Sequence, residues 1–538
     1  QTKPATMQNC TNNPTRPGQV LTKNDLIQLL ELKTDLQYIR MELDRVEAGY
    51  KTLIHLDSNS LVYHLDFAEF LFDQKRVDEA HIHFEKCLSL ATTENDSAFL
   101  CMQLAKTWQA AGQIETAAQL AHLGLALSER LVRRDSLQWA RYLAMSSLSL
   151  GYILHDMQQN SESELLFLNA LSIIATLVRT DPEKYEPALA HACMDLGKFY
   201  LDMSRKAESE KLILQSQEIF ERLAKTDPIR YNPNVATTLE ILGWIYSGQQ
   251  KMEDSERYYL RALEWYEQLA QNIPPRFEPL LAETAGYLGE LYYHMPDLPE
   301  SEKMYLRALE IQERYATYDL LRFGPVLGIN AMNLGHCCYR MQKIPQAESM
   351  YLRCLEAREQ LAQTESSQYK MDMANTATWL GKLYIGQDKI PQGEKLLLRA
   401  FEILEPLAQR DIEYFGPALA SAANDLGVLY AKYTNNPVAE NMFFRAVETY
   451  TRLVPYDPAS IEPKLADATL NLAAFRLENA QFEAGAALGS QSLALLLKYL
   501  PAYGVSNQEI CKRAAIVTAA LRDSLNAHAN FPAAIALQ

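Results

Sequence analysis

The sequence predicts an all-α solenoid of about ten antiparallel helix pairs, with a long helix before the pairs and a capping helix after them. Two recurring features predict this fold. An aromatic residue opens one unit after another at a period of 46 residues, at Tyr185, Tyr231, Phe277, Phe323, Tyr369 and Phe415, and Ile461 opens a seventh copy. A Leu-Gly pair keeps the same period, from Leu196-Gly197 to Leu426-Gly427. Such a period is typical of an array in which each repeat packs only on its neighbours.

Each copy has the apolar spacing of two helices. In the copy that opens at Tyr231, one helical face carries Leu239, Leu242, Gly243 and Tyr246 at i, i+3, i+4 and i+7. A second face carries Ser255, Tyr259 and Ala262 at i, i+4 and i+7. We expect the first helix to begin near Pro233, because the first turn of a helix does not use the N–H that proline lacks.

The order of Leu-Gly, then Tyr, then small, aromatic and small residues resembles the tetratricopeptide repeat, whose usual period is 34 residues. The longer copies here are similar to the extended repeats of kinesin light chain and still more to long-repeat arrays of bacterial proteins. The segment ESEKMYLRALE at 300–310 is typical of the latter. The resemblance covers roughly residues 60–500. It implies a right-handed superhelical solenoid and says little about function.

The organisation along the chain follows from where the repeat is regular. We predict an irregular arm over 1–21, a long helix over 22–56, degenerate repeats over 57–138, regular repeats over 139–460, a degenerate last repeat over 461–504, and a capping helix and tail over 505–538. The last repeat is called degenerate because Leu472-Ala473 replaces Leu-Gly. End repeats are expected to be atypical, because they face water on one side.

The long helix carries an apolar seam at heptad spacing, which includes Leu29, Leu32, Leu36, Ile39, Leu43 and Val46. One interpretation is a coiled coil that joins two copies of the chain as a homodimer. The alternative is a first helix that packs on the first repeat. The seam spans fewer than four heptads, so both interpretations stay open.

Charge and hydropathy exclude some classes of partner. The chain has 51 basic and 67 acidic residues, for a net charge of −16. This balance argues against binding to nucleic acid or to an anionic membrane, since phosphate groups are bound by clustered lysine and arginine. No apolar run approaches about 18 residues, so no transmembrane segment is predicted.

The chain shows no sign of catalytic or metal chemistry. The motifs G-x-S-x-G, H-E-x-x-H, G-x-x-x-x-G-K-[ST] and G-x-G-x-x-G are absent, so we predict no enzyme and no cofactor. Of the eight cysteines, five occupy small or core positions of the repeat, which predicts buried free thiols. Cys337 and Cys338 are adjacent on a helix and point in different directions, so they make a poor metal site.

The resemblance implies that the first helix of each pair lines a concave face on which segments of partner proteins dock. The face of the central copies is predicted to comprise His191, Met194, Asp195, Lys198, Glu240, Trp244, Tyr287, Glu290, Tyr293, Asn333, His336, Tyr339, Arg340, Trp379 and Lys382. Aromatic rings with charges of both signs suit an extended peptide or a partner helix. The alternative is that some of these rings only fill the inner curve of the solenoid.

These features favour a non-catalytic scaffold or adaptor, a subunit of a larger assembly that holds a protein or peptide partner. Two alternatives are a self-associating structural scaffold and a receptor for a small peptide or ligand signal. The first residue, Gln1, and the bacterial character of the repeats favour an exported protein that is periplasmic, secreted or attached to the cell surface. Free core cysteines suit the alternative, a cytoplasmic location.

Overall fold

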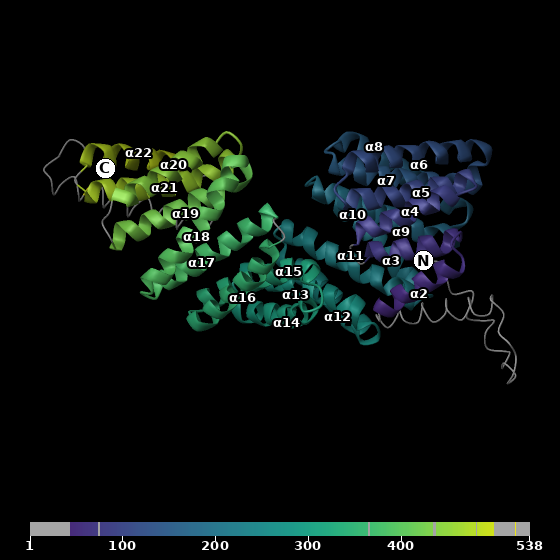
Figure 1. Cartoon of the computed structure of the whole chain (residues 1–538), viewed down its shortest axis with the longest axis horizontal. Helices are drawn as coiled ribbons and strands as arrows, with labels where there is room; N and C mark the ends of the chain where they lie inside the picture. The colour runs from purple at the N-terminus through teal and green to yellow at the C-terminus, as the bar shows by residue number, and fades with distance from the viewer. Residues whose placement is uncertain are drawn as a thin grey trace. The chain divides into compact units, whose positions relative to one another are not determined.

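The computed structural model describes residues 43–73, 76–363, 366–433, 437–479, 481–499 and 522 (Figure 1). Every regular element in these ranges is an α-helix. The first, α2 (Leu43–Leu56), precedes a series of pairs. The pairs are α3 (Leu61–Asp73) with α4 (Val77–Leu90), α5 (Glu94–Ala110) with α6 (Ile114–Arg134), α7 (Ser136–Asp156) with α8 (Asn160–Thr180), α9 (Pro182–Asp202) with α10 (Lys206–Ala224), α11 (Pro228–Gly248) with α12 (Met252–Asn272), α13 (Pro274–His294) with α14 (Leu298–Ala316), α15 (Leu320–Arg340) with α16 (Ile344–Ala362), α17 (Ser367–Gly386) with α18 (Ile390–Arg410), α19 (Ile412–Tyr433) with α20 (Pro437–Leu453), and α21 (Pro458–Glu478) with α22 (Phe482–Tyr499).

The described helices confirm the predicted all-α solenoid of about ten pairs. The chain divides into two compact units, residues 1–284 and 285–538. Within each unit, helices that follow one another along the chain pack side by side, from α3 to α12 in the first unit and from α14 to α22 in the second (Figure 1). A first helix also touches the next first helix, as α5 touches α7 and α17 touches α19.

The two helices of a pair come close together at the glycine of each Leu-Gly motif. In α11, a Cβ added at Gly243 would lie 2.6 Å from the ring of Tyr259 on α12, so only glycine leaves room for that ring. The Ser255 hydroxyl donates a hydrogen bond to the Gly243 carbonyl at 2.7 Å. The same bond recurs from Ser163 to Gly151, from Ser209 to Gly197 and from Ser301 to Gly289.

Polar contacts join each pair to the next around the apolar core. The Tyr246 hydroxyl of α11 donates to a Glu210 carboxylate oxygen of α10 at 2.7 Å. Lys343 donates to Glu302 at 2.6 Å, and Lys389 donates to Glu348 at 3.1 Å. Each acidic residue belongs to the second helix of one pair, and its partner belongs to the next pair. Such contacts recur between one repeat and the next.

The prediction that the first helix begins near Pro233 is wrong. The helix begins more than a turn earlier, at Pro228, where the Asp227 side chain accepts a hydrogen bond from the Arg230 backbone N–H at 3.2 Å. Asp227 and Pro228 therefore act as the N-cap and first residue, and Pro233 lies inside the helix. Prolines also lie inside α9, α13, α15, α19 and α21, at Pro187, Pro279, Pro325, Pro417 and Pro463.

The structure describes only part of the predicted heptad seam. Leu29, Leu32, Leu36 and Ile39 lie outside the described residues, as do the predicted arm over 1–21 and, apart from Arg522, the predicted capping segment over 505–538. Leu43 begins α2. Val46 is fully buried in a cluster with Phe67 and Phe84 of the first pair. At this position the helix packs on the first repeat of its own chain, and nothing supports a homodimer through it.

One described helix, α8, is long and apolar enough to span a membrane by length and composition alone. In the structure α8 packs against α7 and α9 as a member of the array. Its Phe167, Ala170, Ile174 and Leu177 are buried. Packing within the array accounts for these four apolar residues.

We expect Gly243→Ala to lower the free energy of unfolding by about 1–3 kcal/mol, because the new methyl group would displace the buried ring of Tyr259. Urea unfolding followed by circular dichroism measures this change. Gly386→Ala is the matched control, since a Cβ there meets nothing within 4 Å. Its stability should be unchanged or slightly higher. Equal losses in the two variants would contradict the close-approach argument.

The turn between α11 and α12 contains a residue in a strained backbone conformation. Gln250 has φ +60°, a left-handed conformation that favours glycine. Gln250→Gly should therefore raise the free energy of unfolding by about 1 kcal/mol. Urea unfolding measures this change. The neighbouring Gln249 has φ −90°, so Gln249→Gly should not raise the free energy of unfolding in the same measurement.

Candidate binding face of the first helices

The predicted binding residues share one side of the first helices. They lie six, three or two residues before the glycine of the Leu-Gly motif, or one, four or five residues after it. At 100° per residue these positions fall within about 120° of one another. We call this side the first-helix face and describe it separately in the two units.

In the first unit, the face of α9 is largely half-buried. His191 packs edge-on against Phe220, with the ring centroids 5.0 Å apart, and burial lowers its pKa. Asp195 accepts a hydrogen bond from the Tyr152 hydroxyl of α7, and burial raises the pKa of its carboxyl. Lys198 is half-buried beside Asp195. Met194 is an exception to the predicted face, because it is buried in a core cluster with Leu242.

The next first helix, α11, places a carboxylate and a tryptophan on successive turns. The Thr284 hydroxyl donates to Glu240 at 2.6 Å. Burial raises the pKa of Glu240 to about 7, and the charge of Glu283 adds to this effect, while Thr284 and Lys198 oppose it. Trp244 is 55% exposed one turn further on. An ionisable carboxyl and a large exposed ring therefore lie together on this face.

In the second unit, the face carries rings that are covered by cations of the same chain. The Arg340 guanidinium of α15 lies 4.5 Å from the ring centroid of Tyr293 on α13, and it donates to the Tyr293 carbonyl at 3.3 Å. The Lys382 ammonium of α17 lies 5.0 Å from the ring of Trp379 and forms an ion pair with Asp425 of α19 at 3.2 Å. These cations are thus already engaged within the unit.

The remaining predicted residues of the second unit differ in exposure. The Nδ1 atom of His336 lies 2.7 Å from the Tyr351 hydroxyl, and its ring meets Trp379 edge-on at 4.5 Å. Burial, helped by the charge of Arg358, lowers the pKa of His336 to about 4, so the ring is neutral at pH 7. Asn333 is half-buried and donates to the Tyr305 hydroxyl, whereas Tyr287, Glu290 and Tyr339 are exposed.

Sequence reasoning missed three residues of this face. Asp425 occupies the repeat position of Asp195 and Trp379, and it binds Lys382. Ile329 occupies the position of His191 and is 51% exposed, and Val428 occupies the position of Trp244 and is 43% exposed. Applying the same positions relative to the glycine to every copy of the repeat would have found all three.

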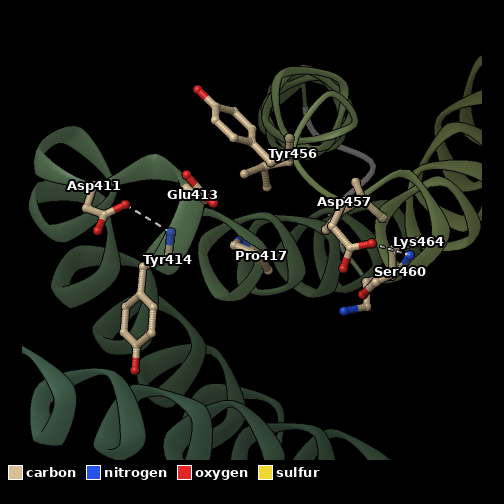
Figure 2. A pocket seen from close by; sticks show the side chains of 10 residues that line it. Asp411, Glu413, Tyr414, Pro417, Tyr456, Asp457, Ser460 and Lys464 are labelled. Atoms are coloured by element: carbon tan, nitrogen blue, oxygen red, sulfur yellow. Dashed lines mark hydrogen bonds between the residues drawn. The ribbon is translucent and has the colours of Figure 1, made fainter. Parts of the chain in front are cut away.

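A pocket of about 490 Å³ lies where α19 and α21 begin (Figure 2). Asp411 accepts a hydrogen bond from the Tyr414 backbone N–H at 3.0 Å, and Asp457 accepts one from the Ser460 backbone N–H at 3.2 Å. Both aspartates thereby cap the helices that follow them. The pocket contains none of the predicted binding residues.

The cysteines of the described ranges act as packing residues. Cys87, Cys101, Cys193, Cys337, Cys338 and Cys354 are buried free thiols, and burial raises the pKa of each. Within the same ranges, no group of three or more His, Cys, Asp or Glu side chains has the arrangement of a metal site.

Comparison with known proteins identifies the repeat. Residues 235–272, which span most of α11 and α12, match the family model of the tetratricopeptide repeat. No curated protein matches the chain. Among solved structures, the chain is similar to BtubC (BKLC) from P. vanneervenii (21% identity, 47% of this chain and 93% of the other, TM-score 0.38). It is also similar to the apo form of RapI (14%, 56% and 99%, 0.39) and to yeast Tom70 (13%, 93% and 97%, 0.36).

The raised pKa of Glu240 predicts a pH effect on stability. The folded chain holds the Glu240 proton more tightly than the unfolded chain, whose ordinary pKa is 4.5, so this group lowers the free energy of unfolding as pH rises from about 4.5 to above 7. The loss is at most about 3 kcal/mol. Glu240→Gln should remove it, so the variant should gain stability over the wild type at pH 8 and not at pH 5.

Urea unfolding at the two pH values measures this difference. Glu290→Gln is the control, because Glu290 is an exposed glutamate on the face of another first helix. It should leave the pH dependence unchanged. A Glu240→Gln variant with the same pH dependence as the wild type would show that the carboxyl ionises freely in the folded chain.

Proposed function

We propose that this chain of tetratricopeptide repeats is a non-catalytic scaffold that holds a segment of another protein on its first-helix faces. The observation that carries the proposal is the exposure of large aromatic side chains there. Trp244 in the first unit and Tyr287, Tyr339 and Trp379 in the second are all exposed to solvent. Aromatic side chains are the usual anchors of protein interfaces, because they bury a large area at little cost in side-chain entropy.

The repeats themselves support this proposal. The glycine that admits a neighbouring ring is kept in copy after copy, because packing requires it. The residue directly after that glycine varies from copy to copy. In the six copies it is Lys198, Trp244, Glu290, His336, Lys382 and Val428, so only the two lysines are alike. The fold therefore does not dictate the chemistry of the first-helix face. That freedom suits a surface shaped to a particular partner.

Charge favours protein over nucleic acid as the partner. The net charge of −16 opposes the phosphate backbone, and the face itself carries acidic as well as basic side chains. A scaffold of this kind would serve as one subunit of a larger assembly, with specificity set by rings and charges at repeat spacing. No described feature favours the self-associating scaffold over this function.

Capture of the tagged chain from its source, with mass spectrometry of the bound proteins, tests the proposal. We expect one stoichiometric partner with the wild type and at least tenfold less of it with the double variant Tyr339→Ala, Trp379→Ala. The control is Phe444→Ala, which removes an equally large exposed ring (53%) from a second helix, α20. Recovery of the chain alone, or equal recovery of the partner with all variants, would contradict the proposal.

A further inference from the structure

Aromatic rings of the first-helix face differ in whether a cation of the same chain covers them. In the second unit, Arg340 covers Tyr293 and Lys382 covers Trp379. In the first unit, Trp244 is the more exposed tryptophan, at 55% against 41% for Trp379. Among the residues that the structure describes, no lysine or arginine lies over its ring. Trp244 therefore offers a cation-binding surface that this chain leaves open.

Two carboxylates of the first-helix face in the first unit also lack an ionic partner. Glu240 precedes Trp244 by one turn of α11, and Asp195 lies on the face of the adjoining first helix, α9. Their hydrogen bonds come from hydroxyl groups, Thr284 for Glu240 and Tyr152 for Asp195. No basic side chain in the described ranges approaches either carboxylate within the 4.0 Å of an ion pair.

This arrangement is unusual for carboxylates that are largely shielded from water. Ionised groups in such places are normally paired, because desolvation costs several kcal/mol per ion. Lys198 is close enough to lower the pKa of both carboxyls, yet it forms no ion pair with them. Glu283, from α13, adds a further negative charge beside Glu240. Glu240 thus has no ion-pair partner, and an open aromatic ring lies one turn of α11 away.

We propose that Trp244 and Glu240 form a subsite that takes an arginine side chain of the partner segment, an inference that rests on the proposed scaffold function. The planar guanidinium stacks on the indole ring while its N–H groups donate to the Glu240 carboxylate. Residues four apart on a helix have Cβ atoms about 5–6 Å apart, which allows one guanidinium to reach both Trp244 and Glu240. Arginine fits better than lysine, because its planar guanidinium can stack on a ring while its N–H groups donate to a carboxylate.

Fluorescence anisotropy with a labelled glycine–arginine peptide at pH 8 and low salt tests the subsite on the full chain. We expect the wild type to bind this peptide, and Trp244→Ala and Glu240→Gln each to weaken binding about tenfold. Phe444→Ala is the matched control, since it removes a similarly exposed ring (53%) from a second helix, α20, outside the first-helix face, and it should bind as the wild type does. Circular dichroism spectra and melting curves of all variants report whether each is folded.

The pH profile separates a direct ionic contact from a structural effect. Glu240 gains a proton as pH falls from 8 to 6, so arginine-peptide affinity should fall over this range in the wild type and stay flat in Glu240→Gln. The groups that face this carboxyl are Lys198 from α9 and Glu283 and Thr284 from α13, with Asp195 and His191 further along α9. Burial lowers the pKa of His191, so its proton does not supply the change.

Several results would overturn the subsite. These are no binding of the arginine peptide to the wild type, binding by Trp244→Ala or Glu240→Gln that is as tight as that of the wild type, or equally tight binding of a glycine–lysine or glycine–glutamate peptide by the wild type. The scaffold function would survive any of them if partner capture still depends on Tyr339 and Trp379. Loss of partner capture as well would remove the proposed function itself, so the two failures can be told apart.

Discussion

The array depends on one packing interaction, in which a large side chain of the second helix lies directly on a glycine of the first. Tyr259 lies on Gly243, Tyr305 on Gly289 and Phe443 on Gly427. In the α9–α10 pair Ile213 takes the place of the ring against Gly197, so the combination of small and large matters more than the identity of the large residue. Each repeat buries its apolar side chains only against its neighbours, so a pair held apart by one methyl group would open the core on both sides.

Because this interaction uses one side of the first helix, the exposed side beside it is free to vary. Packing does not require Trp244, Tyr339 or Trp379, and their exposure is the reason to place partner binding there. The two units use this freedom differently. The second unit covers Tyr293 and Trp379 with its own cations, whereas the first unit leaves Trp244 open one turn from Glu240, which has no ion-pair partner. A partner that engages both units would meet a different chemistry on each.

Much of the fold could be predicted because periodic spacing reports helices directly. The helix starts could not be placed from the repeated proline, because Asp227-Pro228 is an earlier and better capping signal than Pro233. The face was predicted only from the positions of residues within the repeat. Those positions do not show which neighbouring side chain a residue contacts. Met194 is the example, since it shares the spacing of the face but turns into a cluster with Leu242 and Ile245 of the next pair.

The sequence by itself determined the number of helix pairs, the glycines at which they meet and the side of the first helix that faces away from the core. These properties depend on contacts within one repeat, and every repeat displays them again. Only the tertiary structure decided which charges find partners. Lys382 forms an ion pair with Asp425 of the following repeat, whereas Lys198 forms none with Glu240. The distance between groups more than 40 residues apart depends on how one pair is placed on the next, and that placement is set by the summed packing of both pairs.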